Sequence, residues 1–81
     1  MQIPVIKQLV ENHTSEELEQ AEFCLMEEKE LPIEVGGKDD GEVLTHLIAA
    51  GWIIEKMEKD DIPFPKALRA YTEKVRTSIS S

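Results

Sequence analysis

The sequence predicts an all-α protein, a small bundle of about four helices that forms one helical domain over residues 1–81. Apolar residues recur at helical spacing in several segments, helix-capping residues precede two of them, and prolines or a glycine pair separate them. A chain of 81 residues buries only about 60% of its unfolded surface. The core is therefore thin, and assembly with a second copy would add burial.

The first helix is expected over residues 3–11, in the segment IPVIKQLVE. Pro4 falls in its first turn, where a backbone N–H would have no partner within the helix, so the proline is tolerated there. A strand over residues 2–6 is the alternative.

The second helix is expected over residues 15–29, and its start has the clearer signal. Thr14 and Glu17 have the spacing of a capping box, in which the threonine hydroxyl accepts from the Glu17 N–H and the Glu17 carboxylate reaches back. The stripe that faces inward consists of Leu18, Ala21 and Leu25. The helix should end near Lys29, before the next proline.

Residues 31–37 are predicted to be an extended connector, because LPIEV alternates apolar and other residues. A short edge strand is the alternative there, and Gly36-Gly37 ends it. The acids that follow do not form a ligand loop: Lys38 lacks the Ser or Thr that follows the lysine of a phosphate loop, and the acids lack calcium-loop spacing. Asp39 and Glu42 instead predict an acidic helix start.

The third helix is expected over residues 40–59 and the fourth over residues 65–78. Pro63 and Pro65 force the break between them, because proline removes a backbone donor and restricts the residue before it. The fourth helix has one apolar stripe, formed by Phe64, Leu68, Tyr71, Val75 and Ile79.

The third helix is apolar on more than one side, which is the main functional signal in the sequence. One face suffices for the core of a bundle and holds Val43, Leu47, Ala50, Ile54 and Met57. Ile48 and Trp52 point roughly the opposite way, Ile53 lies on a third flank, and Phe23 points away from the core face of the second helix. These four residues form a predicted interface patch that self-associates or receives a partner. Alternatively, the connector over residues 31–35 covers Trp52.

Three residues could in principle carry chemistry: Cys24, His46 and His13. They are too few and too scattered in the sequence for a metal-binding motif. Cys24 is expected to be a small buried hydrophobic residue, His46 a hydrogen-bonded packing residue, and His13 a solvent-exposed loop residue. A thiol-dependent or metal-dependent activity would require the three to meet in one pocket, and this stays as an alternative function.

The net charge of −8 disfavours nucleic-acid binding, because an acidic surface repels phosphates. The charge is uneven: residues 1–42 hold twelve acids and three bases, whereas residues 43–81 hold five acids and six bases. Nucleic-acid contact through the last helix is therefore a second alternative, and its bases are Lys66, Arg69, Lys74 and Arg76. The two halves can also complement each other, within one chain or across a dimer.

Cysteine usage and hydropathy predict a cytoplasmic protein. A single cysteine allows no intramolecular disulfide and gives no sign of an oxidising compartment. The first seven residues do not have the pattern of a signal peptide. The longest nearly apolar run, residues 43–54, falls well short of the roughly 20 residues that cross a bilayer.

Three stretches resemble a known family over essentially the whole chain: IPVIKQLVENHTSEELEQAE, LTHLIAAGWI and ALRAYTEKVRTSIS. The family consists of small acidic bacterial proteins classed as a domain of unknown function. The resemblance implies a stand-alone protein encoded beside a peroxiredoxin and a thioredoxin-like protein. It implies no catalytic residue and no cofactor. The expected function is thus protein–protein interaction by a homodimer, not catalysis, with a protein of a peroxide or thiol system as one possible partner.

Overall fold

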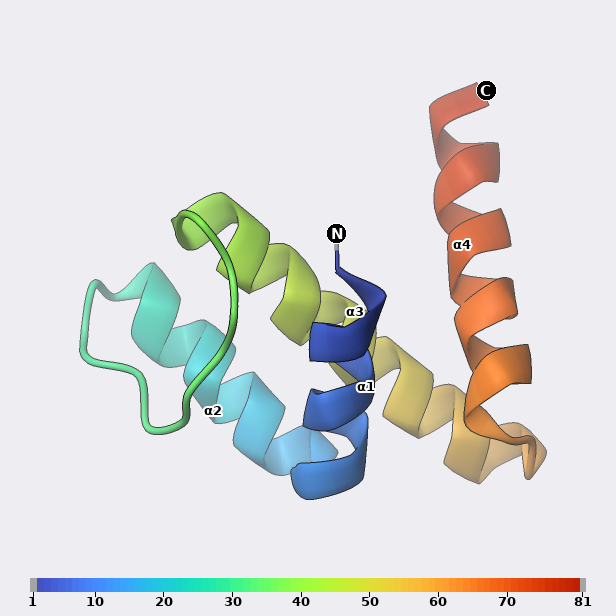
Figure 1. Ribbon diagram of the computed structural model, residues 1–81, viewed down its shortest axis with the longest axis horizontal. Coiled ribbons are helices and arrows are strands. Elements are labelled where there is room, and N and C mark those ends of the chain that lie inside the picture. Colours follow the sequence, from blue (N-terminus) through green and yellow to red (C-terminus); the bar gives the residue numbers. More distant parts are fainter. Residues whose placement is uncertain (1, 81) are drawn as a thin grey trace.

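The computed structural model describes residues 2–80 and shows four helices, so the predicted all-α fold is confirmed. The helices are α1 (Ile3–Asn12), α2 (Ser15–Met26), α3 (Asp40–Asp60) and α4 (Phe64–Ser80), as Figure 1 shows. No strand occurs within residues 2–80, so the strand alternatives for residues 2–6 and 31–35 are wrong. The side chain of Ile79, the last member of the predicted stripe on α4, lies outside the described residues.

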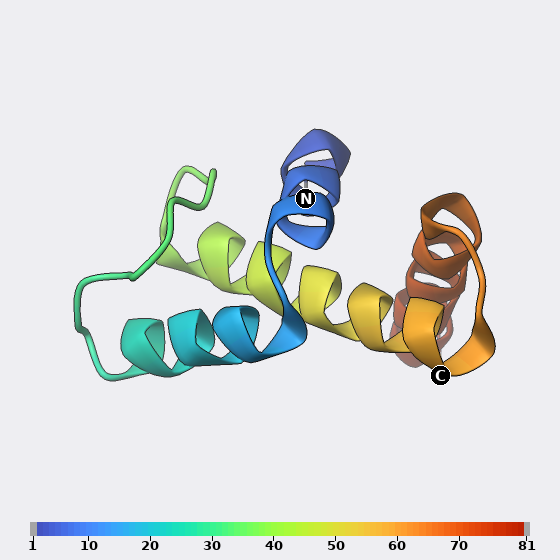
Figure 2. The same cartoon turned by 90° about the horizontal axis from the view of Figure 1, so that it is seen from below.

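The longest helix, α3, is the centre of the fold. It packs against each of the other three helices, and these contact one another far less. Figure 2 shows α2 beside α3, α1 across them, and α4 at the far end of α3. The shortest dimension of the molecule is 19 Å, which corresponds to about two helix layers. A two-layer arrangement leaves part of the surface of α3 without a neighbouring helix.

Side-chain caps define the starts of α2 and α3, as the sequence predicts. The Glu17 N–H donates to the Thr14 hydroxyl at 3.2 Å, and the Thr14 N–H donates to the Glu17 carboxylate at 3.1 Å. The Glu42 N–H donates to the Asp39 carboxylate at 2.8 Å. The acidic segment after the glycine pair is thus a helix cap.

The end of α2 differs from the prediction, because the helix ends at Met26 and not at Lys29. Glu28 has the left-handed φ of 59°, and its N–H donates to the Leu25 carbonyl. The Lys29 N–H donates to the Cys24 carbonyl at 2.8 Å. Together these bonds form a Schellman motif, which satisfies the last carbonyls of the helix and reverses the chain.

The connector between α2 and α3 contributes to the core through Leu31, Ile33 and Val35, which are partly buried. Gly37 lets the connector turn, since its φ is 153° and an added Cβ would lie 2.8 Å from the Val43 side chain.

His46 joins three distant segments inside the fold. Its side chain is fully buried, its Nδ1 lies 2.7 Å from the Gly36 carbonyl, and its Nε2 accepts from the Gln2 N–H at 2.9 Å. Because Nε2 is the acceptor, the proton is on Nδ1, which donates to Gly36. The predicted packing role of this histidine is confirmed.

Candidate interaction surface

Only part of the predicted interface patch is exposed in the structure. Ile48 and Phe23 are exposed, with 46% and 55% of their surface accessible to solvent. The prediction that Ile53 is an interface residue is wrong, because its side chain is fully buried in the core. Met26 is also exposed, and the sequence analysis missed it although it lies three residues from Phe23 on the same side of α2.

Trp52 is half-buried, and its neighbour is α4. Its ring lies 5.6 Å from the Tyr71 ring, tilted by 56°, and the Lys74 ammonium lies 5.4 Å from the indole. This tilted geometry and the cation over the ring are both favourable for an aromatic side chain. Burial under this contact raises the pKa of the Tyr71 hydroxyl. An aromatic contact within the chain thus covers part of Trp52, which neither sequence-based interpretation anticipated.

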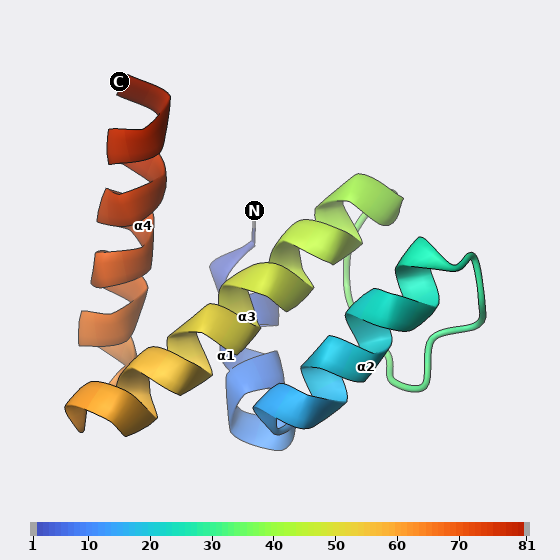
Figure 3. The same cartoon turned by 180° about the vertical axis from the view of Figure 1, so that it is seen from behind.

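A groove of about 190 Å³ runs between α2 and α3 beside Trp52. Figure 3 shows this face of the molecule, with α2 and α3 side by side and α1 behind them. We call it the acidic groove, and its lining consists of Ser15, Leu18, Glu19, Glu22, Ile48, Gly51, Trp52 and Glu55. A Cβ added at Gly51 would meet no atom within 4 Å, so the groove is open at that point.

The acidic groove combines an apolar floor with negatively charged walls. Ile48 and Trp52 supply apolar surface, and no base is among the described residues that line it. The pKa of Glu22 is raised, first by burial and then by the charges of Glu19 and Glu55. All three carboxylates line the same groove, so they repel one another when ionised. A cationic, partly apolar binding partner would relieve this repulsion and cover the floor.

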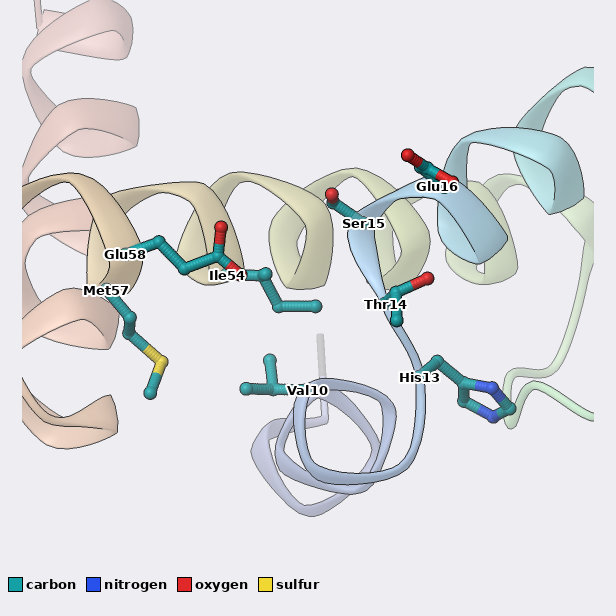
Figure 4. A pocket seen from close by; sticks show the side chains of 8 residues that line it. All are labelled: Val10, His13, Thr14, Ser15, Glu16, Ile54, Met57 and Glu58. Carbon is teal, nitrogen blue, oxygen red and sulfur yellow. The ribbon is translucent and has the colours of Figure 1, made fainter.

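A second hollow, of about 500 Å³, lies where the turn between α1 and α2 faces the second half of α3. Figure 4 shows Val10, Ile54 and Met57 converging on it, while the ring of His13 points away from them. Glu16 and Glu58 lie at its rim. Its lining combines apolar side chains with His13, Thr14, Ser15 and the two glutamates.

The structure separates the three residues considered for chemistry. Cys24 is partly exposed on α2 among Glu16, Glu19 and Phe23, so its expected burial is wrong. His13 is half-buried, not solvent-exposed, and its Nδ1 lies 3.3 Å from the Glu17 carboxylate. The two nitrogens of His46 are occupied in the core by backbone groups.

These different surroundings do not support a shared thiol or metal site built from Cys24, His13 and His46. Among residues 2–80, no group of three or more histidine, cysteine, aspartate or glutamate side chains is arranged to hold a metal ion.

The basic residues of α4 are accessible on its surface. Lys66, Arg69, Lys74 and Arg76 are exposed, and the only acid between them is Glu73. Lys74 also lies over Trp52, so one end of the acidic groove already meets a cation from the same chain.

Comparison with curated proteins gives no significant match, and comparison with solved structures gives none either. Within residues 2–80, no helix combines the length and the apolar character that crossing a membrane requires. A family match covers residues 1–80, which is nearly the whole chain. The chain belongs to the family of unknown function DUF6952.

Proposed function

We propose that this protein is a protein-interaction module that forms a homodimer through the α2–α3 face. The observation that carries the proposal is the exposure of Ile48 and part of Trp52 in a groove whose walls are acidic. An exposed apolar floor with a charged rim is the composition of a protein interface, and aromatic residues are enriched there. A protein of a peroxide or thiol system is a further partner for the same face.

The accessible surface supports the proposal. The chain exposes 5697 Å², whereas a compact monomer of 9.2 kDa exposes about 4,900 Å². The difference of about 800 Å² is similar in size to the surface that one partner contributes to a standard protein–protein interface. A dimer that covers the α2–α3 face would bring the burial of this small chain to a usual level.

Sedimentation equilibrium at micromolar concentration tests the proposal with two matched variants. Ile48→Glu places a charge on the groove floor, and we expect the dimer to weaken by about 2 kcal/mol, or about thirtyfold. Ile3→Glu makes the same change on α1, on the other side of the molecule. The two isoleucines are equally exposed, at 46% and 48%, so neither substitution should unfold the monomer.

We expect wild type and Ile3→Glu to be dimers and Ile48→Glu to be a monomer. A wild-type protein that stays monomeric throughout this range would contradict the homodimer. Equal weakening by both substitutions would mean that the α2–α3 face is not the contact.

A further inference from the structure

We propose that the acidic groove of one chain receives α4 of a second copy, and that the second copy receives α4 of the first in the same way. This inference rests on the proposed homodimer and identifies the two surfaces that meet. It assigns α4 the role of the basic, amphipathic ligand that the groove fits.

The position of α4 leaves the segment around Val75 exposed. Its first half packs on α3, where Ala67 and Tyr71 are buried, and it makes at most marginal contact with α1 and α2. Figures 1 and 3 show the second half of α4 extending away from the rest of the molecule. Val75, the next residue of the apolar stripe after Tyr71, is 36% exposed. An amphipathic helix with an incompletely covered stripe is a common ligand of an apolar groove.

The charges of the two surfaces are opposite. Within Ser15–Met26, α2 has four acids and no base, and α3 adds Glu55 to the groove. Between Phe64 and Arg76, α4 has four bases and one acid. On a helix, neighbouring residues point about 100° apart, so Lys74 and Arg76 flank Val75 on either side. A helix that inserts Val75 toward Ile48 would therefore bring a net positive charge to the acidic walls, although Lys74 also lies over Trp52 of its own chain.

The α4 helix of the same chain cannot fill its own groove in this way. The contact between Tyr71 and Trp52 fixes α4 on one flank of α3, and α2 lies along the other flank. From there the second half of α4 extends away from α2, as Figure 3 shows. A second copy related by a two-fold axis supplies the helix that the first cannot, and two identical contacts then close the assembly.

Charge reversal on each surface separately tests this pairing. One variant carries Glu19→Lys and Glu55→Lys in the groove, and the other carries Arg69→Glu and Arg76→Glu on α4. All four positions are exposed, so circular dichroism should show unchanged helix content. Alone, each variant would place like charges in both contacts, and we expect its dimer to weaken about tenfold or more.

Mixing the two variants is the decisive measurement. In the mixed dimer, a reversed groove meets a reversed helix, and an unchanged groove meets an unchanged helix, so both contacts regain opposite charges. We expect sedimentation equilibrium to show a heterodimer of nearly wild-type affinity. The smaller pair Glu19→Lys and Arg69→Glu repeats the design if a double variant loses helix content.

The outcomes separate this inference from the proposed function. Variants that dimerise as tightly as wild type, or a mixture that stays monomeric, would overturn the pairing of α4 with the groove while the homodimer stands. A monomeric wild type would overturn both. Dimerisation that each variant loses alone and that the mixture restores supports both the homodimer and the pairing of α4 with the groove.

Discussion

The side chain of His46 connects parts of the chain that are far apart in sequence. Its ring nitrogens bond to Gln2 and Gly36, which lie before α1 and in the connector. Both partners are backbone groups outside the helices, so the histidine supplies hydrogen bonds that no helix provides for them. A sequence pattern can place His46 among apolar neighbours and thereby predict a packing role. It cannot name the partners, because they depend on how α1 and the connector fold onto α3.

Replacing His46 with phenylalanine tests this role. His46→Phe keeps a ring in the core but removes the hydrogen bonds to the Gln2 N–H and the Gly36 carbonyl, and each such bond contributes about 0.5–1.5 kcal/mol. We expect urea denaturation to show a loss of about 2 kcal/mol or more. His13→Phe is the control, because His13 is half-buried and has one long contact at 3.3 Å. Equal losses in the two variants would contradict the special role of His46.

Glu22 makes the stability of the fold depend on pH, and the direction of that dependence follows from the shift of its pKa. Burial and the charges of Glu19 and Glu55 raise the pKa of Glu22, so the folded protein holds this proton more tightly than the unfolded chain does. Ionisation as pH rises through the raised pKa therefore lowers stability. The groups that oppose this trend are Glu17 and Asp60. The backbone N–H of Thr14 lowers the pKa of Glu17, and Lys56 lowers that of Asp60.

The variant Glu22→Gln isolates the contribution of this carboxylate. At neutral pH, and at a concentration where the chain is monomeric, we expect it to be more stable than wild type by about 0.5 kcal/mol, a modest value because water screens a half-buried charge. The difference in stability should shrink as pH falls through the raised pKa, since the side chain at position 22 is then uncharged in both proteins. Thermal unfolding over a pH series measures it, with Glu30→Gln in the connector as the control. A stability difference that grows as pH falls would contradict this prediction.

At the scale of helices, the starts were predictable and one end was not. A start depends on a side chain that bonds to a backbone group three residues away, as Thr14 and Asp39 do, and such spacing is visible in the sequence. The end of α2 depends on Glu28 taking a left-handed conformation without being glycine. The usual signal for a helix end, a glycine, is absent there, and the prediction ran three residues too far.

The capping box of α2 should have a measurable effect on stability. Thr14→Ala removes the acceptor of the Glu17 N–H, and the loss of an N-cap costs about 1 kcal/mol. Ser15→Ala is the matched control, because it removes a hydroxyl one residue later, where no cap bond depends on it. Urea denaturation of both variants measures the difference. Similar stabilities for the two variants would mean that the box contributes nothing beyond a generic hydroxyl.

At the scale of the molecule, apolar residues on several sides of α3 predicted that the other helices would leave part of it uncovered. All three of them pack on α3, and Ile48 stays exposed. The sequence did not show which helix covers which face. Trp52 contacts Tyr71, a residue of the fourth helix, and that pairing depends on the angle at which the chain leaves α3. The acidic groove is likewise a product of packing, since Glu22 and Glu55 come from different helices.

Salt dependence distinguishes two ways in which a second copy could approach this molecule. Each copy carries a net charge of −8, so two acidic α2–α3 faces placed against each other would repel, and added salt would tighten that dimer. If α4 enters the acidic groove, opposite charges meet, and added salt would loosen the dimer. Measurements at about 0.1 M and about 0.5 M salt suit the question, because repulsion beyond about 10 Å is already screened at the lower concentration.

We expect the dissociation constant from sedimentation equilibrium to rise modestly between these two concentrations, because exposed ion pairs contribute about 0.2–1 kcal/mol each and salt removes part of that. The variant with Arg69→Glu and Arg76→Glu should show the opposite trend, since its contacts join like charges and screening relieves them. The opposite directions of the two changes in dissociation constant matter more than their size. Salt effects on hydration would shift the dissociation constants of both proteins in the same direction. A dissociation constant that falls with salt in the wild type would favour direct contact between two α2–α3 faces, with α4 outside the interface.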